Sequence, residues 1–162
     1  MSLEHQLGIG KEHQYNHLIQ LGSLIVFLTI WGLDSFVFNL SGKFIRPIGI
    51  PIRIGLFSIT LISGLYLIKA SHDAVLDAKE STSTITTGAY AYGRHPMYLG
   101  TLLIYVSLIF LTMSLVSFIP FIVIFFLYNM LADYEERDLE RILGQEYVEY
   151  KKRVARWIPK IY

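Results

Sequence analysis

Residues 96–132, PMYLGTLLIYVSLIFLTMSLVSFIPFIVIFFLYNMLA, contain no Asp, Glu, Lys or Arg over 37 consecutive positions. The hydrocarbon core of a bilayer is about 30 Å thick, so a helix that rises 1.5 Å per residue crosses it with about 20 residues. The stretch is too long for one such helix, and Ser114, Ser117 and Pro120 favour a turn near its middle. It therefore predicts two short transmembrane helices, 96–114 and 117–134, joined as a tight hairpin.

Two further apolar segments, 18–40 and 48–70, precede this stretch. Asp34 in the first either serves a function inside the membrane or lies near its exit, and Arg53 lies near the start of the second, where it can snorkel. Beyond the hairpin the chain becomes amphipathic, with a helix stop expected at Gly144. With 53% hydrophobic and 17% charged residues, residues 1–162 are predicted to form one all-α integral membrane domain of four transmembrane helices with amphipathic C-terminal helices.

The distribution of Lys and Arg predicts the orientation of this multi-pass protein. Four spans place both termini and the 69–95 connection on one side, and these segments hold eleven of the 14 Lys and Arg residues. Because such residues favour the cytoplasmic side, both termini are predicted to be cytoplasmic. The net charge of +1 offers no dense basic face for nucleic acid, and the lack of Cys excludes thiolate chemistry. His13 and His17 are one helical turn apart but have no convincing third ligand, so no metal site is predicted.

The segment TTGAYAYGRHPMYLG, residues 86–100, contains the strongest candidate for a ligand site. Pro96 suits the first position of a helix, and His95 before it is pushed away from helical geometry. We therefore expect a helix N-terminus at the membrane surface. Its free amides and positive dipole end, with Arg94 beside them, would form an anion site.

The predicted hairpin brings carboxylates to the same level. Its two arms rise equally per residue, so Glu135 and Glu136 return to the level of Arg94. Such a pocket suits a zwitterion with a further positive charge, and the neighbouring tyrosines can stack on an adenine. S-adenosylmethionine is one such ligand, although spacing alone also allows Arg94 to snorkel or to pair with Glu135 as a helix-end ion pair.

The ordered combination of GAYAYGRHPMYLG (88–100), a charge-free hairpin, EE (135–136) and LGQEYVEYKKRVARWIP (143–159) resembles the isoprenylcysteine carboxyl methyltransferase family and the related phospholipid methyltransferases. The resemblance covers about half of the chain, residues 81–159. It implies a small helical membrane protein that holds S-adenosylmethionine on the cytosolic side. The segments that would form the cofactor site are 81–98 and 133–159.

Position by position, the resemblance implies a cofactor site made of Ser83, Thr84, Ile85, Tyr90, His95, Pro96, Met97, Tyr98 and Glu135. The candidate catalytic residues are Arg94, which would hold anionic groups, and His95 and Glu136, either of which could serve as a base. One position departs from the eukaryotic isoprenylcysteine enzymes, because Leu131 stands where they carry a substrate-binding arginine. A buried carboxylate without that arginine would be poorly compensated, so Leu131 indicates a more apolar acceptor.

We therefore expect an integral membrane enzyme that transfers a methyl group from S-adenosylmethionine to a lipophilic small molecule or lipid at the cytoplasmic membrane surface. Two alternatives remain open. A nicotinamide-dependent membrane reductase would bind NADPH and not S-adenosylmethionine. A non-catalytic helical membrane protein would bind neither and would need Glu135 for folding.

Overall fold

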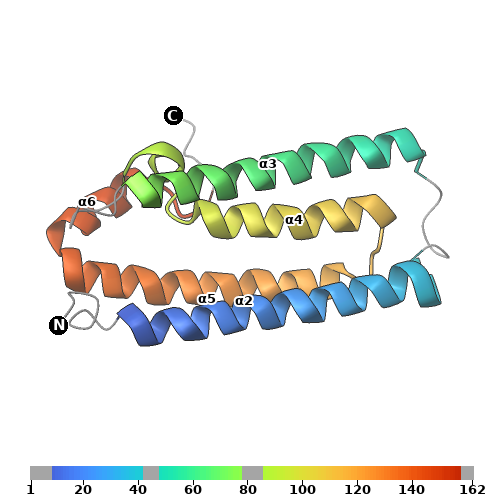
Figure 1. Cartoon of the computed structure of the whole chain (residues 1–162), viewed down its shortest axis with the longest axis horizontal. Coiled ribbons are helices and arrows are strands. Elements are labelled where there is room, and N and C mark those ends of the chain that lie inside the picture. Colours follow the sequence, from blue (N-terminus) through green and yellow to red (C-terminus); the bar gives the residue numbers. More distant parts are fainter. Residues whose placement is uncertain (1–8, 42–47, 78–85, 158–162) are drawn as a thin grey trace.

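The computed structural model describes residues 9–41, 48–77 and 86–157, and the secondary structure of this part of the chain is entirely helical. The α-helices are α2 (Ile9–Gly32), α3 (Ile50–Asp77), α4 (Pro96–Thr112), α5 (Phe118–Leu143) and α6 (Gln145–Arg153). A π-helical segment, η1 (Leu33–Phe38), continues α2, and a 3-10 turn, η3 (Gly88–Ala91), precedes α4. Figure 1 shows α2 to α5 lying lengthwise, each running opposite to the one before it, with α6 at one end.

Three of these helices are long and apolar enough to cross a membrane, by length and composition. They are Asn16–Phe38, which includes η1, and the helices α3 and α5. The predicted all-α class is confirmed, and α4 is a shorter apolar helix of 17 residues, or about 26 Å. It ends before residue 114 because Met113 adopts a left-handed conformation with a φ of 55°.

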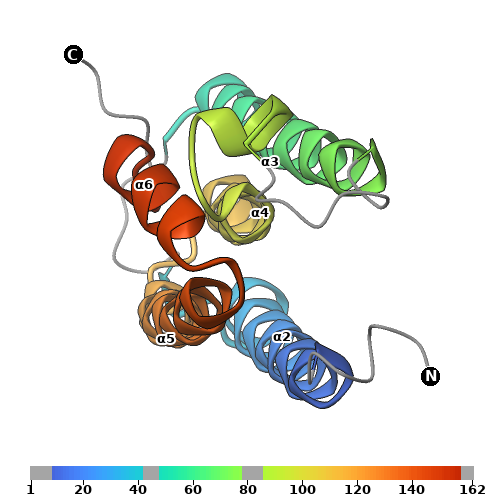
Figure 2. The same ribbon diagram turned by 90° about the vertical axis from the view of Figure 1, so that its left-hand side faces the viewer.

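Helix α4 packs far more extensively against α3 than against α5. The reason is a close approach of two glycines, since a Cβ on either Gly64 or Gly100 would lie 2.7 Å from the carbonyl oxygen of the other. Figure 2 shows the resulting arrangement, with α4 beside α3 and α5 beside α2. The connection between α4 and α5 is short, but these two helices are not the closest pair. The sequence-based picture of a tight α4–α5 hairpin misses this pairing.

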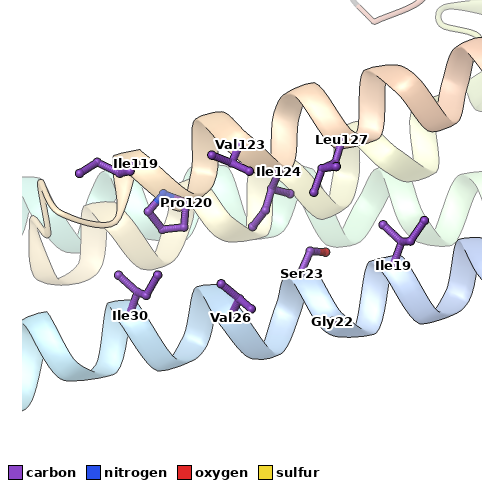
Figure 3. A pocket seen from close by; sticks show the side chains of 10 residues that line it. All are labelled: Ile19, Gly22, Ser23, Val26, Ile30, Ile119, Pro120, Val123, Ile124 and Leu127. Atoms are coloured by element: carbon purple, nitrogen blue, oxygen red, sulfur yellow. The ribbon is translucent and has the colours of Figure 1, made fainter.

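The core lies where α2, α4 and α5 meet, and aromatic side chains dominate it. Phe27, Tyr105 and Tyr128 are almost completely buried there, and the rings of Phe27 and Tyr105 are 4.6 Å apart. The outer faces carry exposed apolar side chains, as expected of surfaces that face lipid. An apolar cavity of about 470 Å³ separates part of α2 from α5 (Figure 3). Ser23 is the one polar side chain in its lining, and its hydroxyl donates to the carbonyl of Gln20.

A buried polar cluster joins η1 to the α4–α5 connection at the end of the bundle opposite α6 (Figure 1). Asp34 accepts hydrogen bonds from the hydroxyls of Ser41 and Ser114 and from the backbone amide of Ser41. Nearby, the indole of Trp31 donates to the carbonyl of Leu108, and the guanidinium of Arg53 donates to that of Leu111. These contacts give Asp34 and Arg53 structural partners and satisfy carbonyls at the end of α4.

Candidate functional site

The site at the α6 end begins with a backbone pairing between the start of α4 and the C-terminal tail. The amide of Arg94 donates to the carbonyl of Ala155 at 3.0 Å, and the amide of His95 donates to that of Arg156 at 3.2 Å. Gly93 permits this approach, since a Cβ there would lie 3.1 Å from the carbonyl oxygen of Trp157. Two amides beside the expected anion site are therefore occupied by the chain itself.

Glu136 is the centre of a buried ion cluster, and 1% of its side chain is exposed. Its Oε1 accepts from Arg94 at 3.0 and 3.1 Å, from Arg156 at 2.9 Å, and lies 3.2 Å from Nε2 of His95. Its Oε2 accepts from Arg156 at 3.0 Å and lies 3.2 Å from Nζ of Lys151. One carboxylate thus joins α5, the start of α4, α6 and the tail. A buried carboxylate requires this number of charged partners.

The same cluster anchors the tail to α5. Arg156 donates to Asn129 at 3.1 Å and to Asp133 at 2.6 Å, and the indole of Trp157 donates to Asn129 at 3.2 Å. The Trp157 ring also lies 5.8 Å from that of Phe125 and 6.1 Å from that of His95. The tail therefore closes the site over α4 and α5.

Glu135 lies beside Glu136 in sequence but in a different environment, and 35% of its side chain is exposed. Its Oε1 accepts from the hydroxyl of Tyr98 and, at 2.9 Å, from the amide of Asn16 in α2. Its Oε2 lies 3.5 Å from Nδ1 of His95. Within the described residues Glu135 has no salt bridge to Lys or Arg. Among the described residues its charged neighbour is His95, so Glu135 has fewer cationic partners than Glu136.

The side chains of Tyr98 and His95 both contact Glu135. The rings of Tyr98 and His95 are stacked, with centroids 5.6 Å apart and planes 6° apart. Burial, followed by the negative charge of Glu135, raises the pKa of the Tyr90 hydroxyl. Tyr90 is therefore buried close enough to Glu135 to be affected by its charge.

His95 lies between the two glutamates, one ring nitrogen toward each. Burial by itself would lower its pKa, but hydrogen bonds to Glu135 and Glu136, with the charges of both carboxylates, outweigh burial and raise the pKa above its ordinary value. His95 is therefore an imidazolium over a wider pH range than a free histidine. In this state both of its nitrogens are donors.

This arrangement predicts a pH dependence of stability. The pKa of His95 is raised in the folded state, so protonated His95 stabilises the fold. Its contribution to the free energy of unfolding is complete below the ordinary histidine pKa near 6.5 and is lost as the pH rises through the pKa of the folded state. We expect the thermal unfolding midpoint to fall across this range above pH 6.5, and to fall less in His95→Gln. The exposed His72, changed to Gln, is the control. An equal pH dependence in the parent and His95→Gln would contradict the expectation.

The structure brings together the α4 and α5 parts of the sequence-predicted site. His95 contacts both Glu135 and Glu136, and Tyr98 donates to Glu135. Tyr90 is near enough to be affected by the charge of Glu135, and Arg94 pairs with Glu136 instead of Glu135. The rest of the predicted set is placed as follows: Pro96 is buried at the first turn of α4, Met97 follows it half-buried, Leu131 is buried in the core, and Ser83, Thr84 and Ile85 lie outside the described residues.

Sequence reasoning missed several residues of the site. Asn16 lies in α2, 119 positions from the Glu135 it contacts. Asn129 lies within the predicted apolar span 117–134, and its contacts with Arg156 and Trp157, which belong to the predicted site segment 133–159, are not indicated by the sequence. The one available signal was a lone Asn in an otherwise apolar stretch, because a polar side chain there needs a partner.

An apolar helical bundle with a cluster of charged side chains at one end is the arrangement of an integral membrane protein. The sequence pattern of the phospholipid methyltransferase family matches residues 53–146, more than half of the chain, so the chain belongs to this family. The family uses S-adenosylmethionine. The chain is accordingly a multi-pass membrane protein.

Two curated relatives are similar over different lengths. Protein-S-isoprenylcysteine O-methyltransferase of Saccharomyces cerevisiae is 26% identical over 160 residues, which cover 96% of this chain and 66% of the yeast protein. Protein-S-isoprenylcysteine O-methyltransferase B of Arabidopsis thaliana is 31% identical over 90 residues, which cover 55% of this chain and 46% of the plant protein. The chain thus spans less than two thirds of either relative. No solved structure matches it.

Proposed function

We propose that this chain transfers a methyl group from S-adenosylmethionine to a lipophilic acceptor at the cytoplasmic membrane surface. The observation that carries the proposal is the contrast between two adjacent glutamates. Glu136 is enclosed by cations of the protein, whereas Glu135 is partly exposed and has no Lys or Arg salt bridge within the described residues. A carboxylate of the second kind, beside Tyr90 and Tyr98, suits a ligand that brings its own positive charge.

The residues around Glu135 fit the donor. We assign the donor's ammonium to Glu135 and the adenosine to Tyr90 and Tyr98. When bound, S-adenosylmethionine would supply an activated methyl group for transfer to the acceptor. The contribution of the chain is to orient and to exclude water.

We assign a structural role to the buried ion cluster around Glu136. The side-chain donors of Arg94 are taken up by Glu136 and by carbonyls of Lys151 and Val154, so it is suited to fasten the tail. His95 is suited to hold both glutamates in place, because one of its ring nitrogens faces each carboxylate. Arg94, His95 and Glu136 thus serve as positioning residues in this proposal.

The proposed acceptor is neutral, amine-bearing or a thiol. Leu131 belongs to the buried core cluster that includes Tyr98 and Tyr128, and this cluster contains no arginine for a carboxylate. In a methyl-transfer assay with labelled donor we expect roughly tenfold or greater preference for lipophilic amines or thiols over prenylcysteine acid. Leu131→Arg should shift the preference toward the acid. Strong parent activity on the acid would refute the acceptor assignment, and methylation of soluble polar acceptors alone would refute a lipid route.

We further propose four membrane crossings, with α4 as the short one and both termini cytoplasmic. The chain has no cysteine, so single cysteines can report each side. Cysteines at the exposed Asp77 and Arg153 should react with an impermeant reagent from the cytoplasm, and one at the exposed Asn39 from the opposite side. Labelling of the Asp77 and Arg153 positions from opposite sides would contradict this topology.

A further inference from the structure

The ring of His95 lies between two carboxylates and contacts each with a different nitrogen. Its Nε2 lies 3.2 Å from Oε1 of Glu136, and its Nδ1 lies 3.5 Å from Oε2 of Glu135. The side chain of His95 is 7% exposed, so water screens these two interactions poorly. The protonation of His95 therefore depends on the charge of both glutamates.

The two glutamates differ in the other groups that compensate their charge. Glu136 binds three further cations, which come from the start of α4, from α6 and from the tail: Arg94, Lys151 and Arg156. Within the described residues Glu135 has a salt bridge to His95 and none to Lys or Arg. The other groups described at Glu135 are two tyrosines and an amide, contributed by α4, η3 and α2: Tyr98, Tyr90 and Asn16. The proton of His95 thus matters more to Glu135 than to Glu136.

A cation bound at Glu135 would compete with the charge on His95. Its positive charge would neutralise the carboxylate that favours protonation of the ring, and it would also lie close to the imidazolium and repel it. Both effects lower the pKa of His95. Glu135 is 35% exposed, so the Nδ1 side of the ring offers the proton a path to water. Glu136 keeps its own cations throughout.

We propose that a cation bound at Glu135 expels a proton from His95 to the solvent, so that binding of S-adenosylmethionine is coupled to proton release. For the identity of the cation, its ammonium, the inference rests on the proposed function. Loss of one neighbouring opposite charge changes the proton affinity of such a group about tenfold, which corresponds to about half a proton released per donor midway between the free and bound titrations.

The coupling predicts opposite pH dependences for donor binding and for stability. The free protein holds more protons than the complex, so donor affinity should rise with pH, up to about tenfold, as His95 loses its proton. The stability contribution of protonated His95 falls over the same range. A purely structural His95 would not raise donor affinity as the pH rises.

The first test needs no donor. It is a pH titration of the detergent-purified full chain by NMR with labelled histidine, in which the His95 signal is the one absent from His95→Gln. We expect the midpoint of this signal to lie at a lower pH in Glu135→Gln than in the parent, because glutamine does not carry the charge. Glu149→Gln, exposed on α6, is the matched control and should leave the midpoint unchanged. An equal midpoint in Glu135→Gln and Glu149→Gln would overturn the inference.

The second test counts the protons released when the donor binds. Calorimetric titration with S-adenosylmethionine is carried out at the His95 midpoint in two buffers that differ in their heat of ionisation. We expect about half a proton more to be released by the parent than by His95→Gln, and His72→Gln, at an exposed histidine of α3, to behave as the parent. The ammonium of the donor, which titrates near pH 7.7–8.0, contributes equally in all three proteins.

The outcomes separate this inference from the proposed function. Donor binding with equal proton release in the parent and His95→Gln would overturn the coupling and leave the proposed function standing. Absence of donor binding would refute the proposed function, and the donor-free titration then decides whether the charge of Glu135 controls the proton of His95.

Discussion

Glu136→Gln is expected to destabilise the protein by about 3–5 kcal/mol, the cost of removing one member of a buried ion cluster. The substitution leaves Arg94 and Arg156 facing an uncharged amide. Water cannot compensate for the lost charge, because 1% of the Glu136 side chain is exposed. It also removes the ionic contacts between Glu136 on α5 and Arg156 of the tail. Thermal unfolding in detergent measures the effect.

Glu140→Gln is the matched control for this substitution. Glu140 pairs with Lys151 at 2.7 Å, but its side chain is 34% exposed, so the pair contributes about 1 kcal/mol or less. We expect Glu140→Gln to unfold close to the parent midpoint. If Glu136→Gln were as stable as Glu140→Gln, the ion cluster would not hold the tail, and its proposed structural role would be wrong.

Glu135→Gln is expected to have the opposite profile: folding retained and donor binding lost. A charge-assisted hydrogen bond contributes about 1.5–3 kcal/mol, so affinity for S-adenosylmethionine should fall about ten- to a hundredfold. Glutamine can still accept from Tyr98 and Asn16 through its carbonyl oxygen, so these two contacts are preserved while the ionic contact with His95 is lost. Calorimetric titration of the variant measures the loss.

The exposed Glu149, changed to Gln, is the control for charge removal near the tail. It should bind the donor as the parent does. An affinity in Glu135→Gln equal to that of Glu149→Gln would remove Glu135 from the donor site. Loss of folding in Glu135→Gln would instead favour a purely structural carboxylate.

Hydropathy and helix punctuation predict much of the fold. The charge-free run 96–132 breaks where α4 ends and α5 begins, and α5 continues through the charged segment to stop at Gly144, whose φ of 57° glycine adopts without strain. The pairing of α4 with α3 was not predictable in this way. It depends on Gly64 meeting Gly100, and an isolated glycine in an apolar segment does not indicate its partner.

The position of the site along the helix bundle was predictable, but the different environments of its two carboxylates were not. Equal arm lengths place residues 135–136 beside 94–95. Adjacent helix positions point about 100° apart, and helix rotation decides which of them faces the cations. In the structure Glu136 faces Arg94 and Arg156, and Glu135 faces Tyr98. The contribution of Arg156 also depends on the path of the tail, which periodicity does not determine.

The most direct test of the central proposal is calorimetric titration of the detergent-purified full chain with S-adenosylmethionine and, separately, with NADPH. We predict saturable binding of S-adenosylmethionine at one site per chain, weakened in Glu135→Gln, and no binding of NADPH. Binding of NADPH without S-adenosylmethionine would contradict the proposal in favour of a reductase, and a folded protein that binds neither would contradict it in favour of a non-catalytic membrane protein.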